Sequence, residues 1–437
     1  MIALSSYIGK TFHLILACRF QSFLLSNKLI DPSLQKAFLS KINGCLEHCS
    51  VLNSLLLHAR TQKKTLHCTW FDLADAFGSI SHSLISFTLS RNHFPPEIQS
   101  YINCLYSQLS ATVTSASWTS DSFVMSRGVF QGDPLSPLIF ILCFNPLLDF
   151  LKTNSQHGYN FNGSFTITLP YADDFNLITH NKRTHQRLIN QLCLLASSMN
   201  LNVKPSKCAS LSIISGSPKP ISFSISDTNI STLFLKPHKY LGSVIGRSAS
   251  SSAGFDFLHD KLSSLLSHIN SSLVRPEYKL KVYTSYALPS LRFHLTVHDL
   301  TKTQLSSLDA LSTRFLKSWL SLPPCATTSV LYDPLSLNLY TISSLYSECH
   351  ALSQAKLALS PDPLVRSALE YKIKHSSSFA KKLSSVTQTN KLVSPILESS
   401  SHLSHSQQYS YAKKQIKSTL NDNFTSFYEE KSVLFLS

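Results

Sequence analysis

The chain places two adjacent carboxylates, Asp173 and Asp174, between two short apolar runs. The runs "SFTITLP" before and "FNLIT" after have the length and residue types of β-strands, so the tetrapeptide "YADD" (171–174) predicts the tip of a β-hairpin. Two carboxylates about 4 Å apart repel by roughly 4 kcal/mol at an effective dielectric constant near 20. The tip is then either well solvated or neutralised by cations.

Other acids gather in two further stretches. Residues 1–246 contain eleven Asp and Glu, and five of these lie in "FDLADAF" (71–77), "QGDPLSP" (131–137) and the tetrapeptide. Residues 65–72 predict a strand that ends at Asp72. If that strand lies beside the hairpin tip, three carboxylates come together. Such oxygen ligands suit Mg²⁺, and two ions about 3.5–4 Å apart are the arrangement used for phosphoryl transfer.

The composition favours a folded protein with a polyanionic partner. The 437 residues suffice for two or three packed units, and 43% hydrophobic against 14% charged residues argues against disorder. The formal net charge of +15 is spread along the chain. It favours nucleic acid over a membrane as the partner, the alternative being a basic protein without such a partner.

The cysteines and the N-terminal residues predict an intracellular protein, nuclear or cytoplasmic and not secreted. The ten cysteines form no CxxC pair, and "GCLEHC" (44–49) lacks the second ligand pair of a zinc site, so we expect reduced thiols. No run of 18 apolar residues occurs, so we expect no membrane span. Lys10, His13 and Arg19 interrupt the first twenty residues, which predicts a packed amphipathic helix rather than a signal peptide.

The pattern of apolar residues predicts mixed secondary structure. Helices are expected over residues 4–60, and "LSPLIFILCFNPLLDFL" (135–151), apolar on every side, predicts a buried helix with Pro137 in its first turn. "QRLINQLCLLASSMN" (186–200) predicts an amphipathic helix. The strand candidates are 111–124, 208–215, 221–226 and 240–246. "RSASSSAG" (247–254) predicts a flexible joint, followed by helices and, from about residue 375, a Ser- and Lys-rich tail.

Taken in order, these stretches resemble a reverse transcriptase of the non-long-terminal-repeat (LINE-type) retrotransposons. "FDLADAFGSISH" is similar to the first palm motif of that family, "QGDPLSPLIF" to the second and "YADD" to the third. "LNVKPSKC" resembles the fourth motif, "YLGSVIG" the fifth, and "QKAFLSKINGCLEHCSVLN" the segment that precedes the palm. The resemblance covers roughly residues 2–246, and a weaker similarity continues through "KSWLSLPPCATTS" (317–329).

The resemblance implies an α+β fold of the right-hand polymerase kind, with an antiparallel palm sheet flanked by helices, partial fingers and a helical thumb. It divides the chain into partial fingers and the start of the palm (1–64), the palm with its motifs (65–246), a thumb-like region (247–340) and a C-terminal tail (341–437). Where the family pattern has an arginine-proline pair before "IALSS", this chain has Met1. We therefore expect most of the fingers and any endonuclease to be absent, and we find no zinc knuckle or ribonuclease H carboxylate set.

The resemblance also implies roles for the acids and for one lysine. Asp72 and Asp173 would hold two Mg²⁺ ions, with Mn²⁺ as an alternative, and Asp174 would be the third acid of the cluster. Lys207 matches the lysine that gives a proton to the departing pyrophosphate, a general-acid role. The alternative for Lys207 is an ordinary surface lysine.

Further positions match the nucleotide pocket and the primer grip. Phe77 corresponds to the steric gate that fills the space of a ribose 2′-hydroxyl; the alternative is an ordinary core residue. Asp75 and Asp133 would orient loops, and Asp75 would lie near the triphosphate. The implied nucleotide-binding residues are Leu73, Ala76, Phe77, Gln131 and Gly132, and the implied primer-grip residues are Leu241 and Gly242.

The function implied is template-directed addition of deoxynucleotides to a primer 3′-hydroxyl. The partners would be an RNA template, a DNA primer and deoxynucleotide triphosphates, with no membrane; the sequence does not give the oligomeric state. Two alternatives remain: an inert nucleic-acid-binding remnant, favoured by the missing fingers, and an RNA-templated RNA polymerase, which the aromatic Phe77 argues against.

Overall fold

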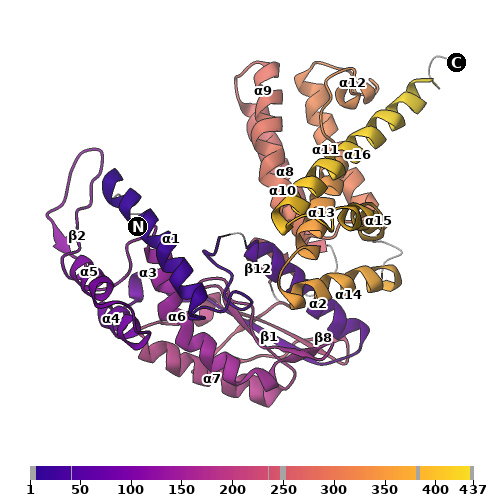
Figure 1. Ribbon diagram of the computed structural model, residues 1–437. Helices are drawn as coiled ribbons and strands as arrows, with labels where there is room; N and C mark the ends of the chain where they lie inside the picture. The colour runs from indigo at the N-terminus through magenta and orange to yellow at the C-terminus, as the bar shows by residue number, and fades with distance from the viewer. Residues whose placement is uncertain (1–5, 41, 235, 247–251, 380–383, 434–437) are drawn as a thin grey trace. The chain divides into compact units, whose positions relative to one another are not determined.

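The computed structural model describes residues 6–40, 42–234, 236–246, 252–379 and 384–433 (Figure 1). The chain forms two compact units. Unit 1 comprises Met1–Cys45 and Lys63–Leu235, and unit 2 comprises Leu46–Gln62 and Lys236–Ser437. The chain thus passes between the units three times, after residues 45, 62 and 235. The joint predicted over 247–254 lies largely outside the described residues. The names fingers, palm and thumb stay predictions.

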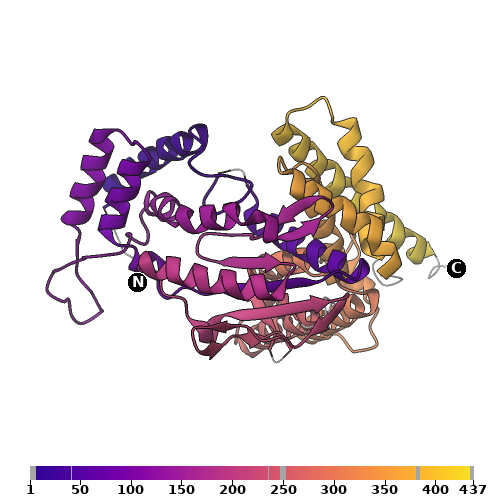
Figure 2. The same cartoon turned by 90° about the horizontal axis from the view of Figure 1, so that it is seen from below.

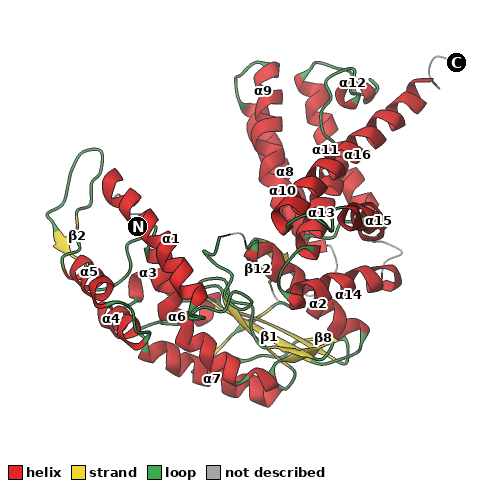
Figure 3. Cartoon of the chain, in the orientation of Figure 1, coloured by secondary structure: helices red, strands yellow, loops and turns green. Residues whose placement is uncertain are grey.

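Unit 1 is built on an antiparallel sheet with β1 (Leu66–Phe71) at its centre, and Figure 3 shows its strands in yellow. β1 pairs antiparallel with β6 (Phe175–Thr179) on one side and with β7 (Ala209–Ile214) on the other. β8 (Ser217–Lys219) pairs antiparallel with β7, and the short β11 (Ser231–Thr232) pairs parallel with it. All six residues of β1 are buried. The predicted α+β class with an antiparallel sheet flanked by helices is confirmed.

The helices of unit 1 include the two that the sequence predicts most directly. α6 (Ser136–Thr153) has Pro137 in its first turn and buries most of its residues. α7 (Lys182–Ser198) is capped by Asn181, whose side chain accepts the N–H groups of Arg183 and Thr184. Among the described residues, α6 is the one helix long and apolar enough to cross a membrane by length and composition alone, and 61% of it is buried within the protein. The helices are α1 (Tyr7–Ser26), α3 (Ala76–Ser79), α4 (His82–Arg91), α5 (Pro96–Ser107), α6 (Ser136–Thr153) and α7 (Lys182–Ser198).

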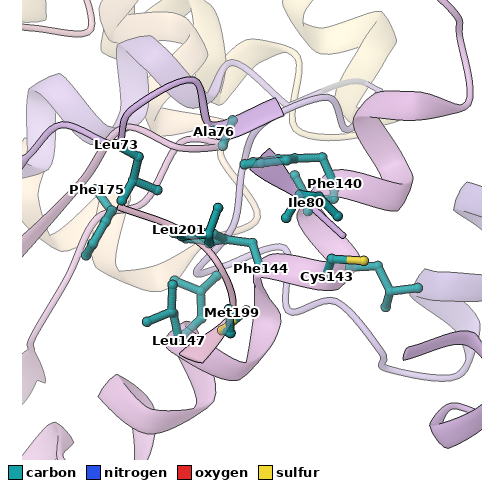
Figure 4. Packing of buried hydrophobic residues seen from close by; sticks show 14 of the residues in the cluster. Leu73, Ala76, Ile80, Phe140, Cys143, Phe144, Leu147, Phe175, Met199 and Leu201 are labelled. Carbon is teal, nitrogen blue, oxygen red and sulfur yellow. The ribbon is translucent and has the colours of Figure 1, made fainter. Parts of the chain in front are cut away.

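The core of unit 1 forms where α6 meets the sheet (Figure 4). Phe140 and Phe144 of α6 lie in one aromatic row, and the ring of Phe144 packs edge-on against Phe175 of β6 at 5.5 Å. Phe175 in turn stacks on Phe71 at the end of β1, with ring centroids 4.8 Å apart. Each fully buried phenylalanine stabilises the fold by about 1.5–3 kcal/mol. This aromatic row fixes the end of the sheet that carries the acids.

Three strand predictions in unit 1 need correction. The segment 111–124 holds only a narrow ribbon, β2 (Ser110–Ala111) with β3 (Phe123–Val124), which projects from the α4–α5 end of the unit in Figures 1 and 2. Residues 111–124 contain many Ser and Thr side chains, so a longer strand here would have no apolar face to bury. The segment 221–226 forms strand only at β9 (Ser224–Ile225), which pairs with β10 (Thr228–Asn229).

The incoming arm of the acidic hairpin is the third correction. β5 (Ser164–Thr166) pairs with β4 (Tyr159–Phe161) rather than with β6. After β5, residues 167–169 lie beside β6. Ile178 N–H donates to the Ile167 carbonyl at 2.7 Å, and Leu169 N–H donates to the side-chain oxygen of Asn176 at 2.9 Å. Pro170 has no N–H to continue a ladder, which explains why the regular strand stops short.

Unit 2 is helical apart from one small hairpin. The predicted single strand 240–246 is two strands, β12 (His238–Tyr240) and β13 (Ser243–Ile245), because the chain reverses at Leu241 and Gly242. α13 lies at the centre of the unit and packs against α10, α11, α14, α15 and α16. The helices are α2 (Gly44–Thr61), α8 (Ser252–Ser271), α9 (Pro276–Val282), a π-helical segment (Tyr283–Ala287), α10 (Leu288–Val297), α11 (Lys302–Trp319), α12 (Ser329–Tyr332), α13 (Ile342–Ala358), α14 (Pro363–Phe379), α15 (Ser384–Ser399) and α16 (His405–Val433).

Candidate active site in unit 1

The sheet register brings the acids of two motifs together. Phe71 of β1 lies opposite Phe175 of β6, so the next residues outward, Asp72 and Asp174, lie opposite each other where the ladder ends. The turn at residues 171–174 closes with two backbone hydrogen bonds: Tyr171 N–H donates to the Asp174 carbonyl at 2.8 Å, and Asp174 N–H donates to the Tyr171 carbonyl at 3.1 Å. The structure therefore has the hairpin tip beside the strand end that the sequence predicts.

The three carboxylates interact electrostatically. Partial removal from water raises the pKa of Asp173, and the negative charge of Asp72 raises it further. The same loss of water, followed by the charges of Asp173 and Asp72, raises the pKa of Asp174 to about 6. The charge of Asp72 thus opposes the ionisation of both Asp173 and Asp174, as expected for like charges in one site.

Lys207 is the cation that the chain itself offers to this cluster. Its ammonium nitrogen lies 3.7 Å from Oδ2 of Asp72, an oxygen that receives no hydrogen bond. The lysine stands in a one-turn helix (Pro205–Lys207) that is fixed to the end of β1, because Lys204 N–H donates to the Asp72 carbonyl at 2.9 Å. The side chain is 61% exposed, so it is free to move toward a ligand.

The carboxylate oxygens of this site are ligands of the kind that divalent cations prefer. All three groups are carboxylates, and the Asp72 oxygen without a hydrogen bond is an available ligand. Within the part of the chain that the structure describes, no group of three or more His, Cys, Asp or Glu side chains converges closely enough to hold an ion alone. Mg²⁺ typically takes one or two protein carboxylates and completes its shell with phosphate and water, so the arrangement fits that mode rather than a closed protein cage.

Phe77 lies near the acids, on the edge of the core. It is half-buried, stacks on Phe140 with ring centroids 4.2 Å apart, and meets Phe38 edge-on at 6.1 Å. The neighbouring Ala76 and Leu73 are buried in the core. Phe77 therefore has the packing contacts of a core residue, and it is also partly exposed, as a steric gate must be. Its role as a gate stays a prediction.

The second motif is tied directly to the first. Val129 N–H donates to the Phe77 carbonyl at 2.9 Å, and Gly128 N–H donates to the Ile80 carbonyl at 2.6 Å. Gly128 has φ +89°, and a Cβ there would lie 2.9 Å from the backbone of Gly78, so only glycine allows this approach. The Gln131 and Gly132 loop follows this junction, half-buried and exposed respectively.

Asp133 supports that loop, as predicted for it, through partners that the sequence did not reveal. Its Oδ1 accepts the N–H of Leu135 at 2.8 Å, and its Oδ2 contacts Nδ1 of His13. Nε2 of His13 bonds to the hydroxyl of Tyr101 at 2.6 Å. His13 and Asp133 are both buried. Asp75, by contrast, is exposed, has φ +44° and lies before α3, and no position near a triphosphate can be assigned to it from its contacts.

The predicted primer-grip residues form a tight turn in unit 2. Leu241 and Gly242 both have positive φ, 45° and 79°. A Cβ on Gly242 would lie 2.7 Å from Cε1 of Phe293, and Nδ1 of His294 donates to the Gly242 carbonyl at 3.1 Å. Burial lowers the pKa of His294 to about 4, so this bond is made by a neutral imidazole at pH 7. The contact of this turn with a primer stays a prediction.

The family described as reverse transcriptase (RNA-dependent DNA polymerase) matches residues 1–245, more than half of the chain. The chain belongs to the reverse transcriptase family.

The chain is also similar to Pol polyproteins of R2 retrotransposable elements. It is 26% identical over 344 residues to the Pol polyprotein of the type-2 retrotransposable element R2DM of Drosophila melanogaster, covering 76% of this chain and 31% of that protein. It is 25% identical over 346 residues to the Pol polyprotein of the type-1 retrotransposable element R2 of Nasonia vitripennis, covering 76% and 32%. The chain thus spans about a third of the length of these relatives.

Two solved telomerase structures are more distantly similar. Telomerase from Candida albicans, in complex with a telomeric RNA fragment, has a TM-score of 0.39 and 12% identity over 84% of this chain and 55% of that one. Apo telomerase from Candida tropicalis has a TM-score of 0.39 and 12% identity over 92% and 61%. Because these TM-scores are low, membership of the reverse transcriptase family rests on the family match over residues 1–245.

Proposed function

We propose that the chain is an RNA-directed DNA polymerase that adds deoxynucleotides to a primer 3′-hydroxyl on an RNA template. The observation that carries the proposal is the meeting of Asp72, Asp173 and Asp174 at one end of the sheet, in a chain of the reverse transcriptase family. Three carboxylates in mutual repulsion are unfavourable for the protein alone. Their presence is explained if the site works with divalent cations.

The site residues would divide the work as follows. Asp72 and Asp173 would hold the two Mg²⁺ ions, or Mn²⁺, with Asp174 as the third acid. When bound, such ions lower the pKa of an attacking hydroxyl and stabilise charge on the leaving oxygens. Lys207, beside Asp72 and largely exposed, would donate a proton to the pyrophosphate that leaves.

The nucleotide would be positioned by the two linked motifs. Phe77 would exclude a ribose 2′-hydroxyl with the exposed face of its ring. The loop with Gln131 and Gly132 would contact the incoming nucleotide, and Gly132, with φ +111°, lets backbone approach it closely. The buried pairing of Asp133 with His13 would keep this loop in place.

The surface of unit 2 supports a nucleic-acid partner. Tyr278, Tyr286 and Phe293 are exposed along α9, the π-helical segment and α10, and the cations Arg275 and Lys281 are exposed in the same region. Aromatic rings and cations together suit nucleic-acid bases and phosphates. All ten cysteines are free thiols, which fits our proposal that the protein works in a reducing, intracellular compartment.

Primer extension tests the proposal. The full chain is incubated with a DNA primer on an RNA template, Mg²⁺ and deoxynucleotides, beside Asp173→Asn. We expect extension by the unaltered chain and a fall of about a thousandfold or more in the variant, since metal-assisted charge stabilisation contributes several kcal/mol. Equal extension by both proteins would contradict the proposal. Binding of primer–template without extension by the unaltered chain would favour the inert remnant instead.

A further inference from the structure

The acidic turn contains a residue in an unfavourable backbone conformation. Ala172, directly before Asp173, has φ +56°, in the left-handed region that residues with a Cβ rarely adopt. The turn also holds two carboxylates that repel each other and Asp72. Both effects favour a rearranged turn, so other contacts must hold it in place.

Gln35 makes those contacts. Its side chain is 1% exposed, and its Oε1 accepts the N–H of Ala172 at 3.0 Å. The same oxygen accepts the N–H of Ala37 at 3.0 Å, and Nε2 lies 3.5 Å from the Ala172 carbonyl oxygen, at the long limit of a hydrogen bond. The side-chain amide of Gln35 thus contacts both the N–H and the carbonyl oxygen of Ala172, two groups that the backbone of a neighbouring strand would otherwise bind. Among side chains, only Gln and Asn combine an acceptor and a donor in this way without a charge.

The adjacent segment contacts the residue before Ala172. A Cβ on Gly44 would lie 2.9 Å from the Lys36 carbonyl oxygen and 3.0 Å from Cε2 of Tyr171, so glycine is needed where the segment passes the turn. Residues that follow Gln35 in the chain therefore also pack against this turn.

We propose that Gln35 is a positioning residue for the acidic turn. It holds Ala172 in its left-handed conformation and so keeps Asp173 and Asp174 aligned with Asp72 against their mutual repulsion. The inference rests on the proposed function for its catalytic consequence, because two ions about 4 Å apart tolerate little displacement of their ligands. A shift of about 1 Å caused by a residue outside the chemistry can cost about a hundredfold in rate.

The test compares three variants of the full chain. Gln35→Met keeps most of the side-chain volume and removes the amide; Gln35→Met with Ala172→Gly also removes the penalty of positive φ. Asn145→Ala is the matched control, since Asn145 is a half-buried amide of unit 1 that donates to the Leu29 carbonyl instead. The first measurement is amide hydrogen exchange of residues 171–174 and of β1. The second is kcat, KM for deoxynucleotide and the Mg²⁺ concentration at half-maximal rate.

We expect Gln35→Met to speed exchange at residues 171–174 about tenfold or more while β1 exchanges as before. It should lower kcat about ten- to a hundredfold and raise the Mg²⁺ requirement, with little change in KM. Ala172→Gly should restore part of kcat, and Asn145→Ala should change none of these values. Unchanged exchange at the turn would overturn the inference, and so would equal acceleration throughout β1. If the unaltered chain extends no primer, the proposed function fails, and the exchange data still decide the role of Gln35.

Discussion

The acidic turn of unit 1 and two acids of unit 2, Asp299 and Glu348, differ in whether a cation of the protein itself neutralises them. In unit 1, Asp173 and Asp174 both have a raised pKa; loss of water is the main cause, and the negative charge of Asp72 adds to it. In unit 2, burial raises the pKa of Asp299, but the charge of Lys372, 2.9 Å away, and smaller contributions lower it overall. Glu348, also buried, lies 3.3 Å from both Arg292 and Lys417. Acids paired within the protein support its structure, whereas acids left in repulsion indicate a site for external cations.

The substitution Asp72→Asn tests most directly whether the acids of the turn and at the end of β1 serve function rather than stability. The change removes one charge of the repelling cluster and a predicted metal ligand, so primer extension should fall about a thousandfold or more, by several kcal/mol of lost charge stabilisation. The melting temperature should not fall, because Asp72 has only a 3.7 Å ion pair with exposed Lys207 to lose. Single-turnover extension and thermal unfolding measure the two effects. A large loss of stability would mean that Asp72 is a structural acid like those of unit 2.

Glu348→Gln makes the complementary test in unit 2. The substitution leaves Arg292 and Lys417 without their shared carboxylate, and we expect unit 2 to lose about 2 kcal/mol of stability, because both cations remain partly solvated. Denaturant unfolding measures the loss. A stability equal to that of the unaltered chain would remove the distinction between the two groups of acids.

Phe77→Ala tests whether the acidic site of unit 1 also serves as a nucleotide pocket. Loss of the ring opens space beside Ala76, so we expect ribonucleotide incorporation to rise about tenfold relative to deoxynucleotide incorporation, within the range of small steric discriminations. Stability should also fall, because the stacking on Phe140 is lost. Competition between the two nucleotides gives the ratio. An unchanged ratio in an active preparation would return Phe77 to an ordinary core role.

The contributions of Asp174 and Asp299 to stability should depend on pH with opposite signs, and this is the smallest of the four predicted effects. The pKa of Asp174 in the folded chain, about 6, lies above its ordinary value of 3.8, so its contribution to stability grows as the pH falls from above 6 toward 4. The pKa of Asp299 lies below 3.8, so its contribution is present above that value and is lost as the pH falls below it.

Asp174→Asn should therefore stabilise unit 1 at pH 7, by about 1 kcal/mol at most since solvent screens this partly exposed group. The variant should also lose the pH dependence between 4 and 6. Hydrogen exchange of β6 across this pH range measures both effects. If hydrogen exchange of β6 depended on pH in the same way with and without Asp174→Asn, the raised pKa of Asp174 would be contradicted.

Local patterns in the sequence were sufficient for much of the fold and for the position of the acids. The strand at residues 65–72, the apolar helix α6 and the hairpin tip each depend on neighbours within a few residues, and pairing of β1 with β6 then places Asp72 opposite Asp174. The hairpin at Leu241 and Gly242 was wrongly predicted as one strand, because two strands of three residues joined by a two-residue turn have the same apolar pattern as one strand.

The contacts that support the site could not be predicted in this way. Gln35 and Ala172 are 137 residues apart, and His13 and Asp133 are 120 apart. A glutamine or histidine in a predicted helix or loop has no local feature that names its partner. The similarity of "QKAFLSKINGC" to a family segment was the only sign that this region mattered, and it carried no information about what Gln35 contacts.

The course of the chain through α2 limits how this protein can be divided. Residues Leu46–Gln62 belong to unit 2, yet the central strand of unit 1 begins at Leu66. Ser54 of α2 donates to the Ala368 carbonyl at 2.9 Å, and Thr61 bonds to the Tyr371 hydroxyl at 2.5 Å. A fragment ending at residue 235 would keep this helix while discarding every partner it has in α14. One cut at residue 235 therefore does not separate the two units, because α2 precedes the cut and its α14 partners follow it.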